Sequence, residues 1–357
     1  MRWVLMAMCV GCLALAPAGA AAVYTETFDN GLVEWKGFEG QPDVTTQEAV
    51  AKHGGALQVK YGLGKGMTSF GTPVGTPPAG ARSIRFQLRA THELALLVAL
   101  GKQNGSMYAS LLHVRPNVWQ DCQLSLQRFR VTKEHPDTDG HLLPEQITMM
   151  GFADVTAGMF GKLRTPGERT IWLDDLTLDS DEAPTAYTRT GQPPLTLDTF
   201  EHDWLPWLAL ESEQQYDTAA GTLAWKYAGA APQPGQFCAL LGGLGQLPGT
   251  GLTHLVVTLK SQRALQLAIV LQEEERGPLK ECRYVKLLEV AATDDFRTIA
   301  VPLSELKLDT SNNGQDPTGK LDLTRVAALF FADVGVLGGQ APGPNTVWFK
   351  ELQLIGE

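Results

Sequence analysis

The sequence predicts an all-β protein made of two tandem antiparallel β-sandwich domains. Three observations support this prediction: a set of segments recurs in the same order in both halves, apolar residues alternate with polar ones over short stretches, and Gly and Pro cluster between those stretches. Alternation with a period of two is typical of half-buried strands, and Gly–Pro clusters are typical of turns. Hydrophobic residues make up 44% and charged residues 19% of the chain, which indicates a packed core.

The recurring segments indicate that one domain has been duplicated. The tetrapeptide FADV stands at 152–155 and again at 331–334. Six further segments match in the same order, with offsets between 166 and 179 residues: FDNGLVEW with FEHDWLPW, ALQVKYG with TLAWKYA, FQLRATHELALLVAL with VTLKSQRALQLAIVL, YASLLHV with YVKLLEV, WQDCQLSLQRF with FRTIAVPLSEL, and TIWLDDLTL with TVWFKELQL. Collinear matches of this kind are the signature of an internal repeat. We therefore predict domains at 23–179 and 195–357, joined by an extended linker over 180–194.

Each unit reads as a series of short strands. In the stretches SIRFQLRA (83–90) and LQLAIVLQ (265–272), every second residue is apolar and points to one face, and the residues between them point to the other face. Only LPEQI and LDLTRV predict a helical turn. Many short strands in about 150 residues per unit favour a jelly-roll sandwich.

The first 22 residues are typical of a secretory signal peptide. One cation, Arg2, precedes an apolar run and a small-residue stretch, and cleavage is expected after Ala20 or Ala22. A lipoprotein signal would use Cys9 or Cys12, but neither has the usual Leu three positions earlier. No later stretch is long and apolar enough to predict a membrane span. We expect the mature protein to be exported and soluble, and so secreted, periplasmic or at the cell envelope.

Charge and cysteine content exclude several classes of protein. The formal net charge is −10, and no block of Lys or Arg predicts binding to nucleic acid or to an anionic membrane.

Removal of the signal leaves Cys122, Cys238 and Cys282, so at least one thiol stays free. A Cys238–Cys282 bridge remains an open alternative. No cysteine spacing predicts a zinc site.

The order of features in each unit resembles the galactose-binding-like jelly rolls, which include carbohydrate-binding modules and the domain of the complex I intermediate-associated protein. The segments that carry the resemblance are FRTIAVPLSEL, GKLDLTRVAALFFADV and NTVWFKELQLI in the second unit and TIWLDDLTLDS in the first. The resemblance covers nearly all of the mature chain. It implies two tandem jelly rolls and, as a function, carbohydrate binding.

The resemblance also implies a structural calcium ion in the first domain, between its first and last strands. Calcium takes several oxygen ligands, and the acids at these positions are Glu26, Asp29, Asp174 and Asp175. In the second unit Lys350 replaces the first acid of the closing pair, so a second site is not expected. The alternative is that these acids are solvated at strand ends.

A second calcium candidate lies at 309–316, in DTSNNGQD. Asp309, Ser311 and Asn313 match the opening of an EF-hand loop, but Lys320 stands where the bidentate Glu is required. The sequence therefore favours a polar turn stabilised by Asn and Asp side chains.

Signatures of catalysis are missing from the sequence. It contains no G-x-S-x-G, no H-E-x-x-H and no phosphate-binding loop, and none of its seven histidines recurs in both units. We predict a protein that is not an enzyme and that binds carbohydrate at the cell envelope or on extracellular polysaccharide. A structural or protein-interaction module of the envelope is the alternative. A glycoside hydrolase with acids drawn from distant positions is a further one.

Sugar binding requires aromatic faces and planar polar groups. Aromatic residues that recur in both units are expected in the cores: Trp35 and Trp207, Tyr108 and Tyr284, Trp119 and Phe296, Trp172 and Trp348. Aromatic residues without a counterpart are the ligand candidates, because sites diverge faster than cores. Together with polar residues on predicted outer faces, the candidate set is Trp204, Trp225, Arg85, Gln87, Arg89, Lys260, Gln272 and Arg283. The alternative for each is a solvated sheet face.

The two FADV segments predict a late strand in each domain. A period of two places Phe152 and Asp154 on one side of the strand. We expect Asp154 and its counterpart Asp333 to accept backbone N–H groups from the loops that follow, which is a structural role. The alternative is that they belong to two equivalent sites.

Overall fold

The protein is described by a computed structural model that covers residues 22–356, apart from 32–33, 48–53, 65, 77, 138–139, 159–164, 182–193, 203–205, 231–237, 277–278, 311–315 and 317. Nearly all of the predicted signal peptide and most of the predicted linker lie outside the described residues. Within them, no helix is long and apolar enough to cross a membrane.

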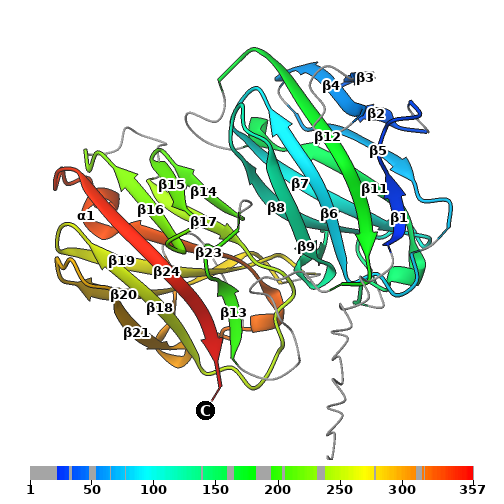
Figure 1. Ribbon diagram of the computed structural model, residues 1–357. Coiled ribbons are helices and arrows are strands. Elements are labelled where there is room, and N and C mark those ends of the chain that lie inside the picture. Colours follow the sequence, from blue (N-terminus) through cyan, green and yellow to red (C-terminus); the bar gives the residue numbers. More distant parts are fainter. Residues whose placement is uncertain are drawn as a thin grey trace, which may run out of the picture.

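The first domain consists of two antiparallel six-stranded sheets (Figure 1). One sheet has the order β3-β4-β12-β6-β9, with β1 paired to β12, and we call it the closing sheet because it contains the last strand. The other has the order β10-β8-β7-β11-β5-β2, and we call it the groove sheet. The strands are β1 Ala22–Glu26, β2 Lys36–Glu39, β3 Asp43–Gln47, β4 Ala56–Gly62, β5 Thr68–Pro73, β6 Ser83–Ala90, β7 Leu94–Lys102, β8 Met107–Val114, β9 Gln120–Ser125, β10 Arg130–Val131, β11 Ile147–Asp154 and β12 Glu168–Asp179.

The second domain repeats this arrangement strand for strand. Its closing sheet has the order β15-β16-β24-β18-β21, with β13 on β24, and its groove sheet has the order β14-β17-β23-β19-β20-β22. The strands are β13 Leu195–Asp198, β14 Trp207–Leu210, β15 Glu213–Asp217, β16 Thr222–Tyr227, β17 Ala239–Gly243, β18 His254–Ser261, β19 Leu265–Glu273, β20 Cys282–Val290, β21 Arg297–Pro302, β22 Lys307–Leu308, β23 Val326–Asp333 and β24 Asn345–Ile355. Each strand of the first domain has its equivalent twelve strands later, so the predicted fold, two tandem antiparallel sandwiches, is confirmed.

In the part of the chain that the structure describes, helical structure is limited to single turns. The two predicted turns form as 3-10 helices at Pro144–Gln146 and Leu323–Arg325. Among the described residues one turn is α-helical, α1 (Val334–Leu337); it begins at the last residue of the second FADV segment, and Asp333 caps it by accepting from the Gly335 N–H.

The core of each domain lies between its two sheets. In β7, Leu94, Leu96, Val98 and Leu100 are at most 1% exposed and belong to the first core, while the residues between them face away from it. β19 alternates in the same way. Because the side-chain period of a strand is two, each groove sheet presents a second, outer face.

Asp154, the aspartate of the first FADV segment, is buried and accepts several hydrogen bonds. Asp154 is 2% exposed, and its Oδ2 accepts from the Tyr61 hydroxyl at 2.7 Å and from Arg169 Nη1 at 3.3 Å. Its Oδ1 accepts from the Thr156 N–H at 2.8 Å, in the loop that follows the strand. Burial, and next the charge of Asp154, raise the pKa of Tyr61 well above its ordinary value, so this hydroxyl stays a donor.

The second aspartate repeats the arrangement with a different arginine. Asp333 is 1% exposed and accepts from the Tyr227 hydroxyl at 2.9 Å and from the Gly335 N–H at 2.9 Å. Arg263, in the turn between β18 and β19, donates to it at 2.6 Å. The prediction that both acids accept backbone N–H groups from the following loops is confirmed.

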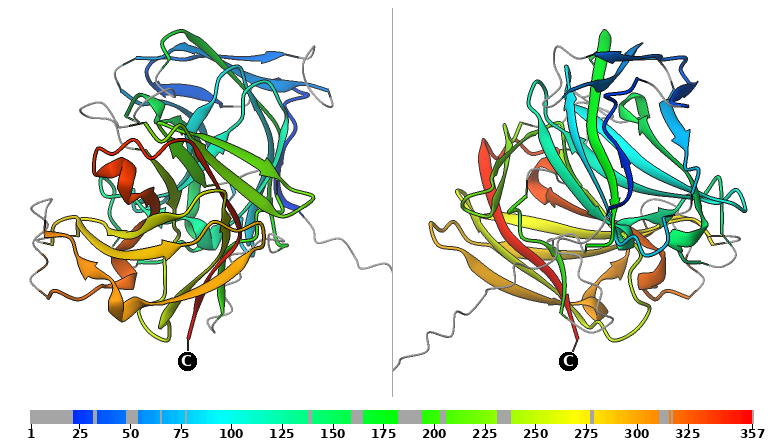
Figure 2. Two further views of the ribbon diagram at one scale, coloured as in Figure 1. Left: turned by 90° about the vertical axis from the view of Figure 1, so that its left-hand side faces the viewer. Right: turned by 45° about the vertical axis from the view of Figure 1, so that its right-hand side comes forward.

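The two domains lie against each other (Figure 1, Figure 2). An apolar cluster joins the outer face of the first groove sheet to β14 and β17, and its members are Ala95, Leu111, Val155, Leu208, Leu210 and Leu241. At Gly245 an added Cβ would lie only 2.8 Å from Arg128 Cα and from Gln127 O of the first domain. The contact is close enough for this position to require glycine.

Polar contacts frame the apolar cluster. Arg130 in β10 donates to both carboxylate oxygens of Glu274, at 2.8 and 2.6 Å, and to the Val326 carbonyl at 2.8 Å. Lys133 and Glu275 form an exposed ion pair at 2.7 Å. A bidentate Arg–carboxylate pair fixes orientation as well as distance, so these contacts set how the domains meet.

Candidate binding groove on the second domain

A groove of about 1010 Å³ lies on the outer face of the second groove sheet. It crosses the sheet from β14 and β17, through β23 and β19, to β20 and β22. Its apolar lining consists of Leu210, Leu241, Ala268, Val270, Val285, Leu287, Leu308, Phe330, Val334 and Leu337. Successive side chains of a strand point to opposite faces of the sheet. The strands that send every second residue into the core therefore send the residues between them outward, into the groove. Protein pockets for drug-sized ligands span roughly 300–1,000 Å³, so the groove has room for an elongated ligand.

Polar side chains converge on this apolar floor. Gln272 in β19 and Arg283 in β20 are direct cross-strand partners, and Arg283 Nε donates to Gln272 Oε1 at 3.2 Å. The acceptor end of the amide is thereby engaged with the arginine, and its NH2 end is the one that can donate to a ligand. A planar amide and a planar guanidinium thus stand side by side at the margin of the groove.

The charges that line the groove balance one another. The cations are Arg283, Lys286 and Lys307, and the carboxylates are Glu281, Glu305 and Asp309, so the formal sum is zero. Lys286 and Glu305 pair at 2.7 Å, and that hydrogen bond holds the pKa of Glu305 below its ordinary value. A chain with a net charge of −10 therefore presents an electrically neutral groove, which suits an uncharged ligand.

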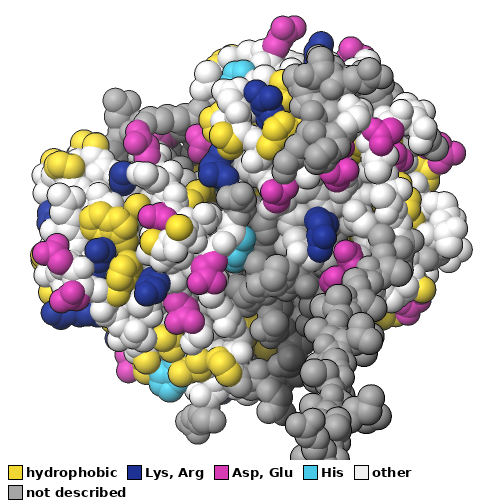
Figure 3. Space-filling view, in the orientation of Figure 1, with side chains coloured by type: hydrophobic (Ala, Val, Ile, Leu, Met, Phe, Trp, Pro, Cys, Tyr) yellow, Lys and Arg dark blue, Asp and Glu magenta, His cyan; other side chains and the backbone are white. Residues whose placement is uncertain are grey.

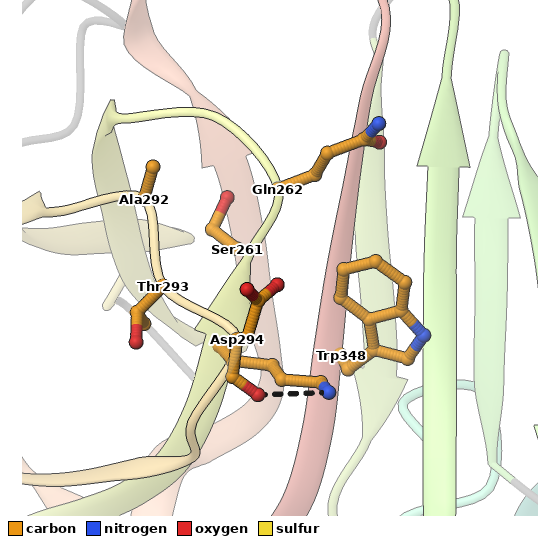
Figure 4. A pocket seen from close by; sticks show the side chains of 7 residues that line it. Ser261, Gln262, Ala292, Thr293, Asp294 and Trp348 are labelled. Carbon is orange, nitrogen blue, oxygen red and sulfur yellow. Dashed lines mark hydrogen bonds between the residues drawn. The ribbon is translucent and has the colours of Figure 1, made fainter.

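Of the predicted ligand residues that the structure describes, only Gln272 and Arg283 meet in this groove. Lys260 lies on the other sheet of the same domain, the closing sheet. There its Nζ is 5.2 Å from the centroid of Trp348 and 5.0 Å from that of Phe296. It also donates to the Asp294 carbonyl at 3.1 Å (Figure 4). The turns beside Trp348 enclose a small pocket of about 250 Å³.

The outer face of the closing sheet mixes aromatic and charged side chains. From the side of β12 and β24, Figure 3 shows hydrophobic and Lys or Arg side chains next to one another over the second domain. The first domain has the equivalent pair, with Arg89 5.4 Å from the Trp172 centroid. In both domains a cation covers a half-buried tryptophan, which is an ordinary way to shield an aromatic ring on a sheet surface.

The three candidates from the first domain lie on the outer face of its closing sheet, far along the chain from the groove. Gln87 Nε2 donates to Asp175 at 3.2 Å, and Arg85 pairs with Asp179 at 3.6 Å. Arg89 is engaged with Trp172. Their assignment to a ligand stays a prediction, since all three side chains have neighbours within their own domain.

The prediction that Trp225 contacts a ligand is wrong. Its side chain is 0% exposed in the core of the second domain, and its Nε1 donates to Ser212 Oγ at 2.9 Å. The ring packs 4.5 Å from that of Tyr227, measured between centroids. Trp225 lacks an aromatic counterpart because the second core is packed differently. The other tryptophan candidate, Trp204, lies outside the described residues.

Two of the four aromatic pairs that were expected in the cores are not there. Trp35 with Trp207 and Tyr108 with Tyr284 are core residues, as predicted. Trp119 with Phe296 and Trp172 with Trp348 are only half-buried. Trp172 and Trp348 lie in β12 and β24, and Trp119 and Phe296 directly precede β9 and β21. All four rings are partly exposed, so recurrence in both units also marks a shared surface feature.

The four predicted calcium ligands bind backbone and side-chain donors. Glu26 accepts from the Phe28 N–H at 3.1 Å, Asp29 from the Gly55 N–H at 2.8 Å, and Asp174 from the Asp175 N–H at 2.8 Å. Among the described residues no group of three or more His, Cys, Asp or Glu side chains is arranged to hold a metal ion. Calcium in the first domain stays a prediction.

Other polar features of the sequence have structural roles. Asp316, at the end of the EF-hand-like segment, accepts from the Tyr284 hydroxyl and from the Thr318 N–H at 2.9 Å; residues 311–315 lie outside the described residues. Cys122, Cys238 and Cys282 are buried thiols that form no disulfide, so the Cys238–Cys282 bridge does not form. Burial raises the pKa of Cys238 to about 12, which keeps its thiol protonated.

Sequence reasoning missed the apolar members of the groove. Phe330 directly precedes the core residue Phe331, so the period of two already places it on the outer face. Its counterpart in the first unit is Gly151, because Val270 pairs with Phe330 and the equivalent Ala99 pairs with Gly151. Absence of an aromatic counterpart, combined with the outward parity, is the signal that would have found Phe330.

No protein-family model matches the chain, and no curated protein matches it. The solved structures that match include carbohydrate-binding modules and two agarases. The family 11 module of the cellulosomal cellulase Lic26A-Cel5E of Clostridium thermocellum is 17% identical, with a TM-score of 0.35, and the match covers 46% of this chain and 100% of that one. The tandem family 22 modules of Xyn10C from Paenibacillus barcinonensis are 11% identical, with a TM-score of 0.30 over 96% of this chain and 99% of that one.

The family 29 module CBM29-2 is 12% identical, with a TM-score of 0.28, over 45% of this chain and 84% of that one. These likenesses concern the arrangement of strands, so a ligand for this chain has to be inferred from its own groove.

Proposed function

We propose that this protein is an exported, non-catalytic carbohydrate-binding protein, acting at the cell envelope or on extracellular polysaccharide, and that the groove of the second domain binds a neutral glycan. The observation that carries the proposal is the pairing of an apolar floor with the Gln272–Arg283 pair above it. A pyranose ring has an apolar C–H face and a rim of hydroxyls, so it needs both kinds of surface at once.

The neutral balance of the groove supports an uncharged glycan over an acidic one. Each of two lining carboxylates already has a cation beside it, Glu305 with Lys286 at 2.7 Å and Glu281 with Arg283 at 3.4 Å. Adding an anionic sugar would leave one charge without compensation in a partly desolvated groove, which is costly.

The state of Glu305 also supports binding without catalysis. A general acid for glycoside hydrolysis needs a raised pKa, so that it still holds its proton near neutral pH. The pKa of Glu305 is instead lowered by its hydrogen bond to Lys286. This carboxyl is therefore suited to accept a hydrogen bond from a hydroxyl, and not to protonate a leaving group.

The test is binding of neutral oligosaccharides to the full chain, on an array and then by calorimetry. Arg283→Ala should weaken binding by about tenfold or more, because it removes a planar hydrogen-bond donor and also the hydrogen bond that orients the Gln272 amide. Arg297→Ala is the matched control, since Arg297 is an exposed arginine on the closing sheet of the same domain. Equal losses in both variants, or binding of acidic glycans only, would refute the proposed site.

A protein-interaction module is the second candidate. Leu287 and Leu337, at the margin of the groove, are 46% and 38% exposed, and exposed apolar patches mark protein contacts as well as ligand sites. Light scattering separates the two functions: a concentration-dependent oligomer that Leu287→Ser abolishes would favour protein contact, and a monomer that binds glycan would favour the first proposal.

A further inference from the structure

The duplication gives each domain a groove sheet, and the cross-strand pairs show which positions are equivalent. In the second domain Ala268 pairs with Leu287, and in the first Leu97 pairs with Leu111. Leu111 is therefore the counterpart of the groove residue Leu287. The same face of the same sheet can thus be compared position by position in the two copies.

The first domain lacks the side chains that make the groove. The pair Gln272–Arg283 corresponds to Gly101–Met107. The pair Leu241–Phe330 corresponds to Gly71–Gly151. At the three positions taken by Gln272, Phe330 and Leu241, the first domain has glycine, which offers neither an aromatic face nor a hydrogen-bonding side chain.

The close packing at these glycines keeps the face flat. A Cβ added at Gly71 would lie 2.4 Å from Met150 O and 2.9 Å from Gly151 Cα. A Cβ added at Gly151 would lie 2.9 Å from Phe70 O. Because real Cβ atoms do not come this close to backbone, the first domain cannot rebuild the groove by single substitutions at these sites.

The first domain uses the same face to hold the second domain. Leu111 and Ala95 pack in one apolar cluster with Leu208 and Leu210 of the second domain. A Cβ added at Gly243 would lie 3.1 Å from Leu111 Cβ, so β17 of the second domain fits closely over this leucine. Leu111 thus makes a contact between the domains, whereas its counterpart Leu287 lines an open groove.

We infer that the two copies have divided their roles: the groove sheet of the second domain binds the ligand, and the equivalent face of the first domain is a docking surface for the second. The chain then has one binding site, not two, and a ligand stoichiometry of one. The binding half of this inference rests on the proposed function, and the docking half rests on the contacts alone.

The matched leucines provide the experiment. Leu111→Arg and Leu287→Arg make the same change at equivalent positions, and each full-length variant is measured by small-angle X-ray scattering and by titration with the neutral oligosaccharide that the unaltered chain binds. A compact chain of this length has a radius of gyration of about 20 Å. Leu111→Arg should increase that radius and should weaken binding less than Leu287→Arg does, since Leu111 contacts the groove at its Leu210 and Leu241 end. Leu287→Arg should keep the radius and weaken binding by about tenfold or more.

A second variant guards against misfolding. Gly243→Val adds a side chain against Leu111 from the second domain, so it should also increase the radius of gyration. Circular dichroism checks that the β-sheets of each variant remain folded. If both Leu111→Arg and Gly243→Val keep the compact radius, or if Leu111→Arg abolishes binding as Leu287→Arg does, the division of roles is refuted. A stoichiometry of two would refute it as well. If the unaltered chain binds no glycan, the proposed function fails, and the scattering result still decides the docking role.

Discussion

The buried aspartates of the two FADV segments allow a prediction in which the two domains serve as controls for each other. Asp154→Asn and Asp333→Asn each keep the side-chain shape and remove the charge. Both acids accept from a tyrosine, a backbone N–H and an arginine, but their arginines differ in exposure. The Arg169 side chain is 1% exposed, whereas that of Arg263 is 26% exposed.

This difference sets the expected magnitudes. Removing one partner of a fully buried ion pair costs about 3–5 kcal/mol, because the other charge is left without compensation. We therefore expect Asp154→Asn to lower the free energy of unfolding by about 4 kcal/mol. Arg263 can be solvated when it loses its partner, so Asp333→Asn should cost about 2 kcal/mol, near the value of charged hydrogen bonds. The shorter Arg263–Asp333 distance, 2.6 against 3.3 Å, would predict the opposite order if distance mattered more than burial.

The assay is urea unfolding of the full chain, followed by circular dichroism and tryptophan fluorescence, with glycan binding measured on the folded variants. A larger loss for Asp333→Asn than for Asp154→Asn would refute the argument from burial. Loss of binding at unchanged stability would show that these acids belong to a site and not to the framework of the fold.

Three further predictions follow from the same contacts. Trp225→Phe should lower the free energy of unfolding by about 2 kcal/mol, through lost volume and the lost bond to Ser212, with unchanged glycan affinity; weaker binding in calorimetry would contradict its place in the core. The pKa of Glu275 is lowered from 4.5 to about 2, first by its hydrogen bond to Lys133 of the other domain. This contact therefore stabilises the chain above pH 4.5 and is lost as the pH falls toward 2, and Glu275→Gln should flatten that pH dependence in thermal melting, which salt should also weaken. Gly245→Ala should separate the domains and raise the radius of gyration, because its Cβ would lie 2.8 Å from first-domain backbone, while Gly75→Ala, with open space around it, should not.

The fold could be predicted from the sequence because its signals are local and doubled. Alternation in 83–90 and 265–272 defines strands from neighbouring residues alone, and the second copy confirms each assignment. The two FADV segments lie in equivalent strands, with Phe152 and Phe331 both in the cores. The hydrogen bond that the aspartate of each FADV segment accepts at the end of its strand is also local, since the N–H that donates it is two residues away.

The site could be predicted only in part, because it depends on which sheet a strand joins. Arg85, Gln87 and Arg89 were correctly placed on an outer face, but β6 belongs to the closing sheet, whereas β19 and β20 belong to the groove sheet. That choice is made by pairings with strands many residues away, such as β6 with β12 and β19 with β23. No pattern within a strand records it.

Divergence between the copies is a useful guide to function only when it is combined with side-chain direction. Trp225 and Phe330 both lack an aromatic counterpart in the first unit. Trp225 points inward, so its uniqueness reflects a core that was repacked after duplication. Phe330 points outward onto the sheet that carries Gln272 and Arg283, so its uniqueness creates a surface that the first domain does not have. The residues that should respond to glycan are therefore those that are unmatched, outward-facing and on the groove sheet, and Phe330→Ala should weaken binding at least as much as Arg283→Ala in the same titration.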